Sequence, residues 1–94
     1  MHRLTLEMTI TREDFLRLLP AAVGGTLSHE AGDHFRGGDV AKRWAIQLIP
    51  LAEHRLGRLV LPSHRIELQF DGFAQADVDA FMARFLQKFQ RGGG

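Results

Sequence analysis

Two segments near the middle of the chain decide the fold: residues 43–50 read RWAIQLIP, and residues 57–70 read GRLVLPSHRIELQF. In both, apolar and polar side chains alternate with a period of two, which is typical of a β-strand with one buried face. The inner face is expected to carry Trp44, Ile46, Leu48, Ile66, Leu68 and Phe70. The interval 52–57 supplies the turn, so the sequence predicts a central antiparallel hairpin.

The second segment contains a conflict of parity. Leu59 and Leu61 fall on the opposite face from Ile66 and Phe70 if the strand runs unbroken. Proline is confined to the edges and bulges of sheets, and Pro62 lies between the two sets. We therefore expect a bulge or break at residues 62–63 that allows all four apolar side chains to be buried.

The segment before this hairpin predicts a strand followed by a short helix. Residues 3–10 alternate between polar and apolar, as one face of a strand would. Thr11 is a suitable N-cap for a helix that buries Phe15 and its neighbours. Pro20 should stop or kink this helix near residue 19, because a proline ring clashes with the carbonyl one turn earlier. Glycines 24 and 25 close the element.

Residues 26–38 predict a weak hairpin with strands at 26–30 and 34–36 around a tight turn at 31–33. Because β-branched residues are few, we expect it to be short and to lie at the edge of the sheet. Residues 37–39, Gly-Gly-Asp, are expected to form a mobile connector.

The last element is a strongly amphipathic helix over residues 77–89. Together these elements predict an α+β fold of one domain, residues 1–91, with a flexible glycine tail at 92–94. The architecture is a two-layer sandwich in which an antiparallel sheet of three to four strands carries both helices on one face. The element order is β-α-β-β-β-α.

Composition narrows the function classes. The 94 residues carry a net charge of +1 and no cysteine, which argues against dedicated nucleic-acid binding and excludes thiolate chemistry. No apolar run is long enough to cross a bilayer. We expect a cytoplasmic protein without a cofactor. The absence of a catalytic constellation favours an interaction or ligand-binding module over an enzyme.

The leading hypothesis is a homodimer formed through an edge or a face of the sheet. Ala45, Ile49 and Leu51 share the outer face, and with Trp44 they could form an apolar patch. An open sheet also leaves unpaired strand edges.

Two alternatives involve small ligands. The central hairpin has a local excess of positive charge, and guanidinium groups suit phosphate or carboxylate. The candidate contacts are Trp44, His54, Arg55, Arg58 and Arg65. A metal-binding accessory protein or small enzyme using His29, Asp33 and His34 is the other alternative, although Gly32 breaks the helix that a zinc-protease spacing requires.

The chain ends Gln90-Arg91-Gly92-Gly93-Gly94, which resembles the tails of ubiquitin-like modifiers and sulfur carriers. The resemblance implies activation of a terminal carboxylate. In those families the tail follows a strand of a β-grasp core, whereas here it follows a helix.

Overall fold

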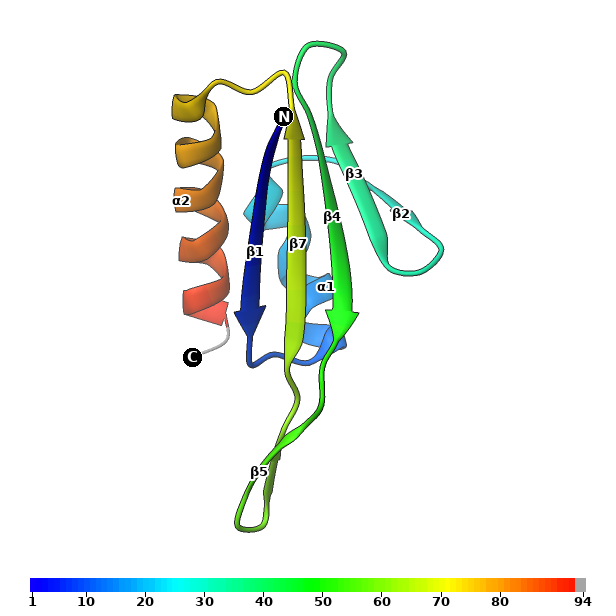
Figure 1. Cartoon of the computed structure of the whole chain (residues 1–94), viewed down its shortest axis with the longest axis vertical. Helices are drawn as coiled ribbons and strands as arrows, with labels where there is room; N and C mark the ends of the chain where they lie inside the picture. Colours follow the sequence, from blue (N-terminus) through cyan, green and yellow to red (C-terminus); the bar gives the residue numbers. More distant parts are fainter. Residues whose placement is uncertain (93–94) are drawn as a thin grey trace.

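The computed structural model describes residues 1–92, the side chains of His54 and Arg91 excepted. Five strands form one antiparallel sheet in the order β1-β7-β4-β3-β2, and two more form a separate ribbon, β5-β6 (Figure 1). The elements in chain order are β1 (His2–Met8), α1 (Arg12–Val23), β2 (Ser28–Glu30), β3 (His34–Gly38), β4 (Arg43–Pro50), β5 (His54–Leu56), β6 (Leu59–Leu61), β7 (His64–Asp71) and α2 (Gln75–Gly92). The α+β class with an antiparallel sheet and two helices is confirmed. The number of strands is corrected from three or four to five, plus the ribbon.

The extra strands come from the segment that looked weakest in sequence. Residues 28–38 do form a hairpin, and its outer strand β2 has three residues and lies at the sheet edge. Gly37 and Gly38 belong to β3 and are not a mobile connector. Gly37 pairs with Trp44, and a Cβ atom there would overlap the indole ring. Glycine is therefore needed for the sheet and the tryptophan to pack.

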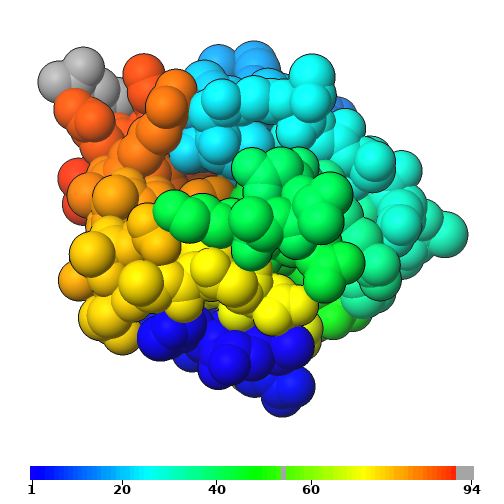
Figure 2. Space-filling view, turned by 90° about the horizontal axis from the view of Figure 1, so that it is seen from above, coloured from blue at the N-terminus to red at the C-terminus, as the bar shows by residue number. Residues whose placement is uncertain are grey.

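One hydrophobic core lies between the sheet and the helices. Both helices contribute to the same cluster as the inward-facing residues of the central strands, so they cover one face of the sheet. The buried cluster consists of Ile10, Phe15, Leu19, Ala22, Phe35, Trp44, Ile46, Leu48, Ile66, Leu68, Phe70, Val78, Phe85 and Phe89. The end-on view shows the N-terminal residues of β1, in blue, at one margin of the molecule (Figure 2). The other face of the sheet is open.

Helix α1 begins as predicted but ends later. The Thr11 hydroxyl accepts a hydrogen bond from the Asp14 amide at 3.1 Å. The helix then continues through Pro20 to Val23, where Gly24 caps it in the left-handed conformation. Of the predicted stop or kink near residue 19, the stop is wrong, because Leu19 and Ala22 are both buried and hold the last turn against the core.

The predicted break at residues 62–63 is confirmed, since β6 ends at Leu61 and β7 begins at His64. The predicted burial of Leu59 is wrong, because its side chain is 63% exposed. The chain does not simply change parity there: residues 54–61 leave the sheet altogether and form the ribbon below it (Figure 1). The turn lies at Gly57-Arg58 and not across residues 52–57.

Helix α2 runs from Gln75 to Gly92, slightly longer than predicted at both ends. Of the predicted glycine tail, Gly92 closes this helix, and residues 93–94 lie outside the described residues. Within the described part of the chain, neither helix has the length and apolarity that a membrane crossing requires.

Candidate interaction surfaces

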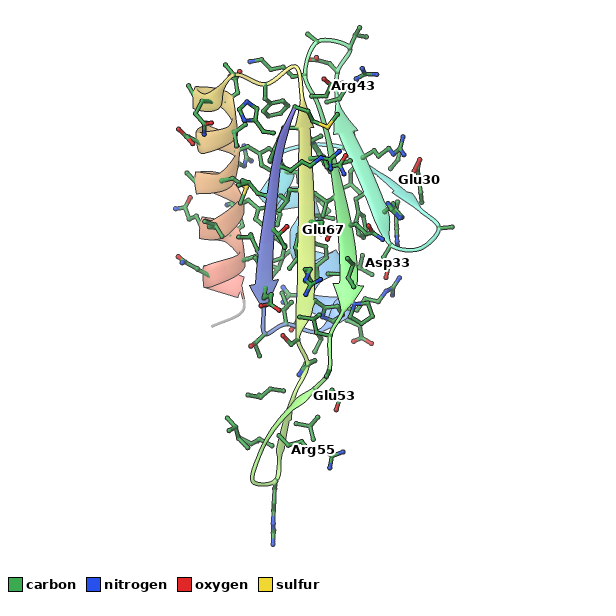
Figure 3. All side chains as sticks on the ribbon, viewed as in Figure 1. Glu30, Asp33, Arg43, Glu53, Arg55 and Glu67 are labelled. Carbon is green, nitrogen blue, oxygen red and sulfur yellow. The ribbon has the colours of Figure 1, made fainter. Side chains whose placement is uncertain are left out.

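The β5-β6 ribbon projects from one end of the molecule, and we call residues 54–61 the arm. It gives the protein a long axis of 48 Å against 26 and 21 Å for the others. In Figure 3 its side chains, including that of Arg55, stand apart from those of the body. Leu56 and Leu59 are 64% and 63% exposed, and Val60 is 47% exposed. The arm thus holds three of the most exposed large apolar side chains, which fold stability alone does not explain.

The root of the arm is firmly anchored. Ser63 and His64 are buried where the arm leaves the sheet. The His64 Nδ1 lies 2.8 Å from the carbonyl oxygen of Ile10 and donates a hydrogen bond to it. The Leu51 amide donates a hydrogen bond to the Ser63 carbonyl at 2.9 Å. This bond joins the two chain segments that lead into the arm, residues 51–53 and 62–63, which we call its neck. The arm is therefore presented in a defined direction from the sheet.

The tip of the arm is both apolar and basic. Gly57 has a φ of 62°, which allows the tight turn, and the flanking Arg55 and Arg58 are exposed. Predicted ligand residue His54 lies on β5, and its side chain lies outside the described part. A surface that combines leucines with arginines is suited to an apolar partner surface bordered by acidic groups.

The open face of the sheet is polar rather than apolar. Strand parity places charged side chains of both signs on it, and Glu67 lies at its centre (Figure 3). The face carries Arg3, Arg36, Arg43 and Arg65 together with Glu7, Glu30, Glu67 and Asp71. Two of these pairs form exposed ion pairs, Arg36–Glu30 at 3.2 Å and Arg43–Asp71 at 3.3 Å. The charges on this face balance.

The predicted apolar patch is not present as a large exposed surface. Ala45 and Ile49 lie on the open face but are partly buried among polar neighbours, and Leu51 follows the end of β4. Trp44 lies on the inner face, is 6% exposed and contacts Phe81 of α2, with ring centroids 5.9 Å apart. It is a core residue that also lines one hollow beside Arg36 and Arg43, and its contact with a ligand stays a prediction.

Two shallow hollows on the sheet meet at residues that the sequence did not single out. Their volumes are about 330 and 440 Å³, and both are lined by Arg36, Gly37 and Arg43. Strand parity could have placed Arg36 and Arg43 on the same face of the sheet. That inference requires β3 to pair with β4, which the weak hairpin pattern did not establish. Arg36 is paired with Glu30, and Arg43 is paired with Asp71. The positive charge of these two arginines is therefore balanced by neighbouring carboxylates.

Of the three predicted anion-binding arginines, Arg55 and Arg58 both lie at the tip of the arm, and Arg65 lies apart from them. Arg58 lies at the turn of the arm, whereas Arg65 lies on the open face of β7. Seven residues of extended chain at about 3.3 Å each separate them by roughly 20 Å. A single small anion cannot contact both.

The structure brings together only two of the three predicted metal ligands. His29 and Asp33 do meet, with Nε2 and Oδ1 at 2.8 Å, but His29 faces the core side and stacks on Phe35. His34 lies on the open face. Asp33 is further engaged by Arg12, which donates two hydrogen bonds at 2.8 and 2.9 Å. This contact holds the pKa of Asp33 well below its usual range.

The Arg12–Asp33–His29 group is a structural link rather than a metal site. It ties the start of α1 to the turn of the β2-β3 hairpin, and a carboxylate so neutralised is a poor cation ligand. Among the described residues, no group of three histidine, aspartate or glutamate side chains is arranged to hold a metal ion.

Comparisons with known proteins supply no further guidance: no family model, curated protein or solved structure matches this chain. The candidate surfaces therefore stand on geometry and chemistry alone.

Proposed function

We propose that this protein is a non-enzymatic interaction module that binds a partner protein through its arm. The supporting observation is the exposure of Leu56, Leu59 and Val60 on a ribbon outside the sheet and the core. Exposed apolar clusters on small proteins mark interaction sites, since leaving them in water costs roughly 25 cal/mol per Å². We also propose a cytoplasmic location, in keeping with the lack of cysteine.

The chemistry of the arm defines the partner. An apolar groove would accept the leucines, and acidic side chains at its border would pair with Arg55 and Arg58. Anion binding by the open face is less favoured because its arginines and carboxylates are balanced. Catalysis is less favoured because three carboxylates with altered surroundings, Asp33, Asp39 and Asp77, are engaged in ion pairs and capping turns.

A photo-crosslinking residue placed at position 59 tests this proposal in cells of the source organism. We expect one discrete adduct with a single protein, and we expect its loss when Arg55→Glu and Arg58→Glu are added. Position 40 is the matched control, because Val40 is apolar and 96% exposed but lies away from the arm.

The adduct partner, once purified, should bind the wild-type chain in calorimetry and lose at least tenfold in affinity to Leu59→Ser. Equal, diffuse labelling from positions 59 and 40 would overturn the proposal. Flotation of the purified chain with vesicles of phosphatidylcholine and phosphatidylglycerol, abolished by Leu59→Ser, would show instead that the arm binds lipid.

A further inference from the structure

Strand β1 leaves a long edge of the sheet open. In the described part of the chain, β7 is the only strand that pairs with β1, and the pairing is one to one from His2 to Met8 without a bulge. Natural sheets protect their edges with short strands, prolines, bulges or inward charges. The opposite edge strand, β2, has three residues. The seven residues of β1 contain no proline and no bulge, and β1 lies on the outside of the molecule (Figure 2).

The sequence of β1 is nearly self-complementary about Thr5. It reads His2-Arg3-Leu4-Thr5-Leu6-Glu7-Met8. In an antiparallel pair of two such strands related by a two-fold axis at Thr5, residue 3 of each copy lies opposite residue 7 of the other. Arg3 would then face Glu7 twice, and Leu4 would face Leu6 twice. Opposite charges and apolar pairs directly across two strands both stabilise a sheet.

The side chains on both faces of β1 are available for this pairing. Arg3 and Glu7 lie on the open face. Glu7 is opposite Arg65 of β7, but no ion pair among the described side chains involves Arg3 or Glu7. On the inner face Leu4 is 37% exposed, and Leu6 is only partly buried. Helix α2 runs beside β1, and its Leu86 is also 37% exposed (Figure 1). A second copy would cover apolar surface at this edge.

We propose that two copies of this chain pair antiparallel through β1, centred on Thr5. The product is a continuous ten-stranded sheet, twice the five strands of one copy, with four helices on one face. The polar face remains open across both copies, and the two arms point in opposite directions. This interface is separate from the arm, so each can fail without the other.

Charge reversal with rescue tests the register. The single variant Arg3→Glu places a glutamate opposite Glu7 at two points of the interface. The single variant Glu7→Arg places an arginine opposite Arg3 at the same two points. We expect each single variant to raise the dimer dissociation constant at least tenfold, measured by sedimentation over a hundredfold dilution. The double variant Arg3→Glu/Glu7→Arg restores opposite charges and should recover dimerisation to within about threefold of wild type.

Two controls separate the interface from folding and from the arm. Arg3 and Glu7 are exposed, so circular dichroism should show every variant folded. Arg58→Glu on the arm should leave the dimer unchanged. A monomer at all concentrations, or a dimer insensitive to both single reversals, would overturn the proposal.

Cysteine crosslinking gives an independent readout, because the chain has no cysteine of its own. Directly opposed residues of paired strands have Cβ atoms about 4.5–5.5 Å apart, so a small shift of the two strands brings them into disulfide range. We expect Thr5→Cys to form a covalent dimer within minutes under mild oxidation. Arg17→Cys on α1, similarly exposed, should not. Equal crosslinking of the two variants would contradict the proposed register.

Discussion

Asp33 connects two elements that are distant in sequence. It sits at the β2-β3 turn with a φ of 55°, a conformation that aspartate and asparagine tolerate better than most residues. Its carboxylate accepts hydrogen bonds from Arg12, 21 residues away, and contacts the His29 ring. The link fixes the edge hairpin against the helical layer.

Replacing Asp33 with Asn removes the charge while keeping the turn. We expect the free energy of unfolding at pH 7 to fall by up to about 1 kcal/mol, since the group is partly exposed and screened. Hydrogen bonds from Arg12, followed by those from His29, lower the pKa of Asp33 from its ordinary value of 3.8. Its stabilisation is therefore complete above about pH 4 and is lost as pH falls toward the lower folded-state pKa.

Urea denaturation at pH 7, 5 and 3 measures this dependence. The difference between wild type and Asp33→Asn should narrow in acid. Glu53→Gln on the exposed neck of the arm is the control and should show no difference at any of these values. A difference that widens as the pH falls would contradict the assignment.

At the scale of elements, the arm and the edge hairpin are two ribbons with opposite roles. The β2-β3 hairpin contributes Phe35, which is fully buried, and pairs with the central strand β4. The strands of the arm pair with each other, and none of its described side chains belongs to the buried core. The β2-β3 hairpin is therefore part of the folded domain, whereas the arm projects from it.

Excision of the arm should therefore leave the domain folded. Replacing residues 53–61 with a short glycine turn should change the free energy of unfolding by less than about 1 kcal/mol, because loop closure depends weakly on length. Replacing residues 28–36 in the same way should abolish cooperative unfolding. Denaturant titration followed by circular dichroism distinguishes the two. An unfolded product from the first excision would show that the arm supports the core.

At the scale of the whole molecule, aromatic rings join the layers. Phe15 of α1 lies 5.8 Å from Phe35 of β3 and 5.1 Å from Phe89 of α2, measured between ring centroids. Phe85 continues the contact along α2 at 4.6 Å from Phe89. The sheet and both helices thus share one cluster and should unfold together.

Phe15→Ala removes the ring at the centre of this cluster. We expect a loss of roughly 3–5 kcal/mol, a large part of the stability of a domain this size. Val40→Ala, at a side chain that is 96% exposed, is the control and should cost less than about 0.5 kcal/mol. Thermal or urea denaturation measures both, and similar losses in the two variants would contradict the central position of Phe15.

The features that sequence determined are local ones. Alternation in residues 43–50 and 64–70 predicts the central strands because successive side chains of a strand point to opposite faces. Thr11 predicts the start of α1, since its hydroxyl can accept a hydrogen bond from an amide in the first turn of the helix. The period of the apolar residues near Phe85 predicts α2 and its buried face. The break at Pro62 also follows from local backbone chemistry.

Contacts between distant residues were decided by the tertiary structure. The sequence grouped His29, Asp33 and His34 as one metal site, yet the strands place His29 and His34 on opposite faces, and Arg12 binds Asp33. Leu59 has the pattern of a buried residue, but its segment pairs with β5 in a ribbon outside the main sheet, and its side chain is exposed. Nor does the sequence show that β1 lies beside β7 with its other edge free. Such pairings depend on long-range packing, which periodicity and capping within one segment do not specify.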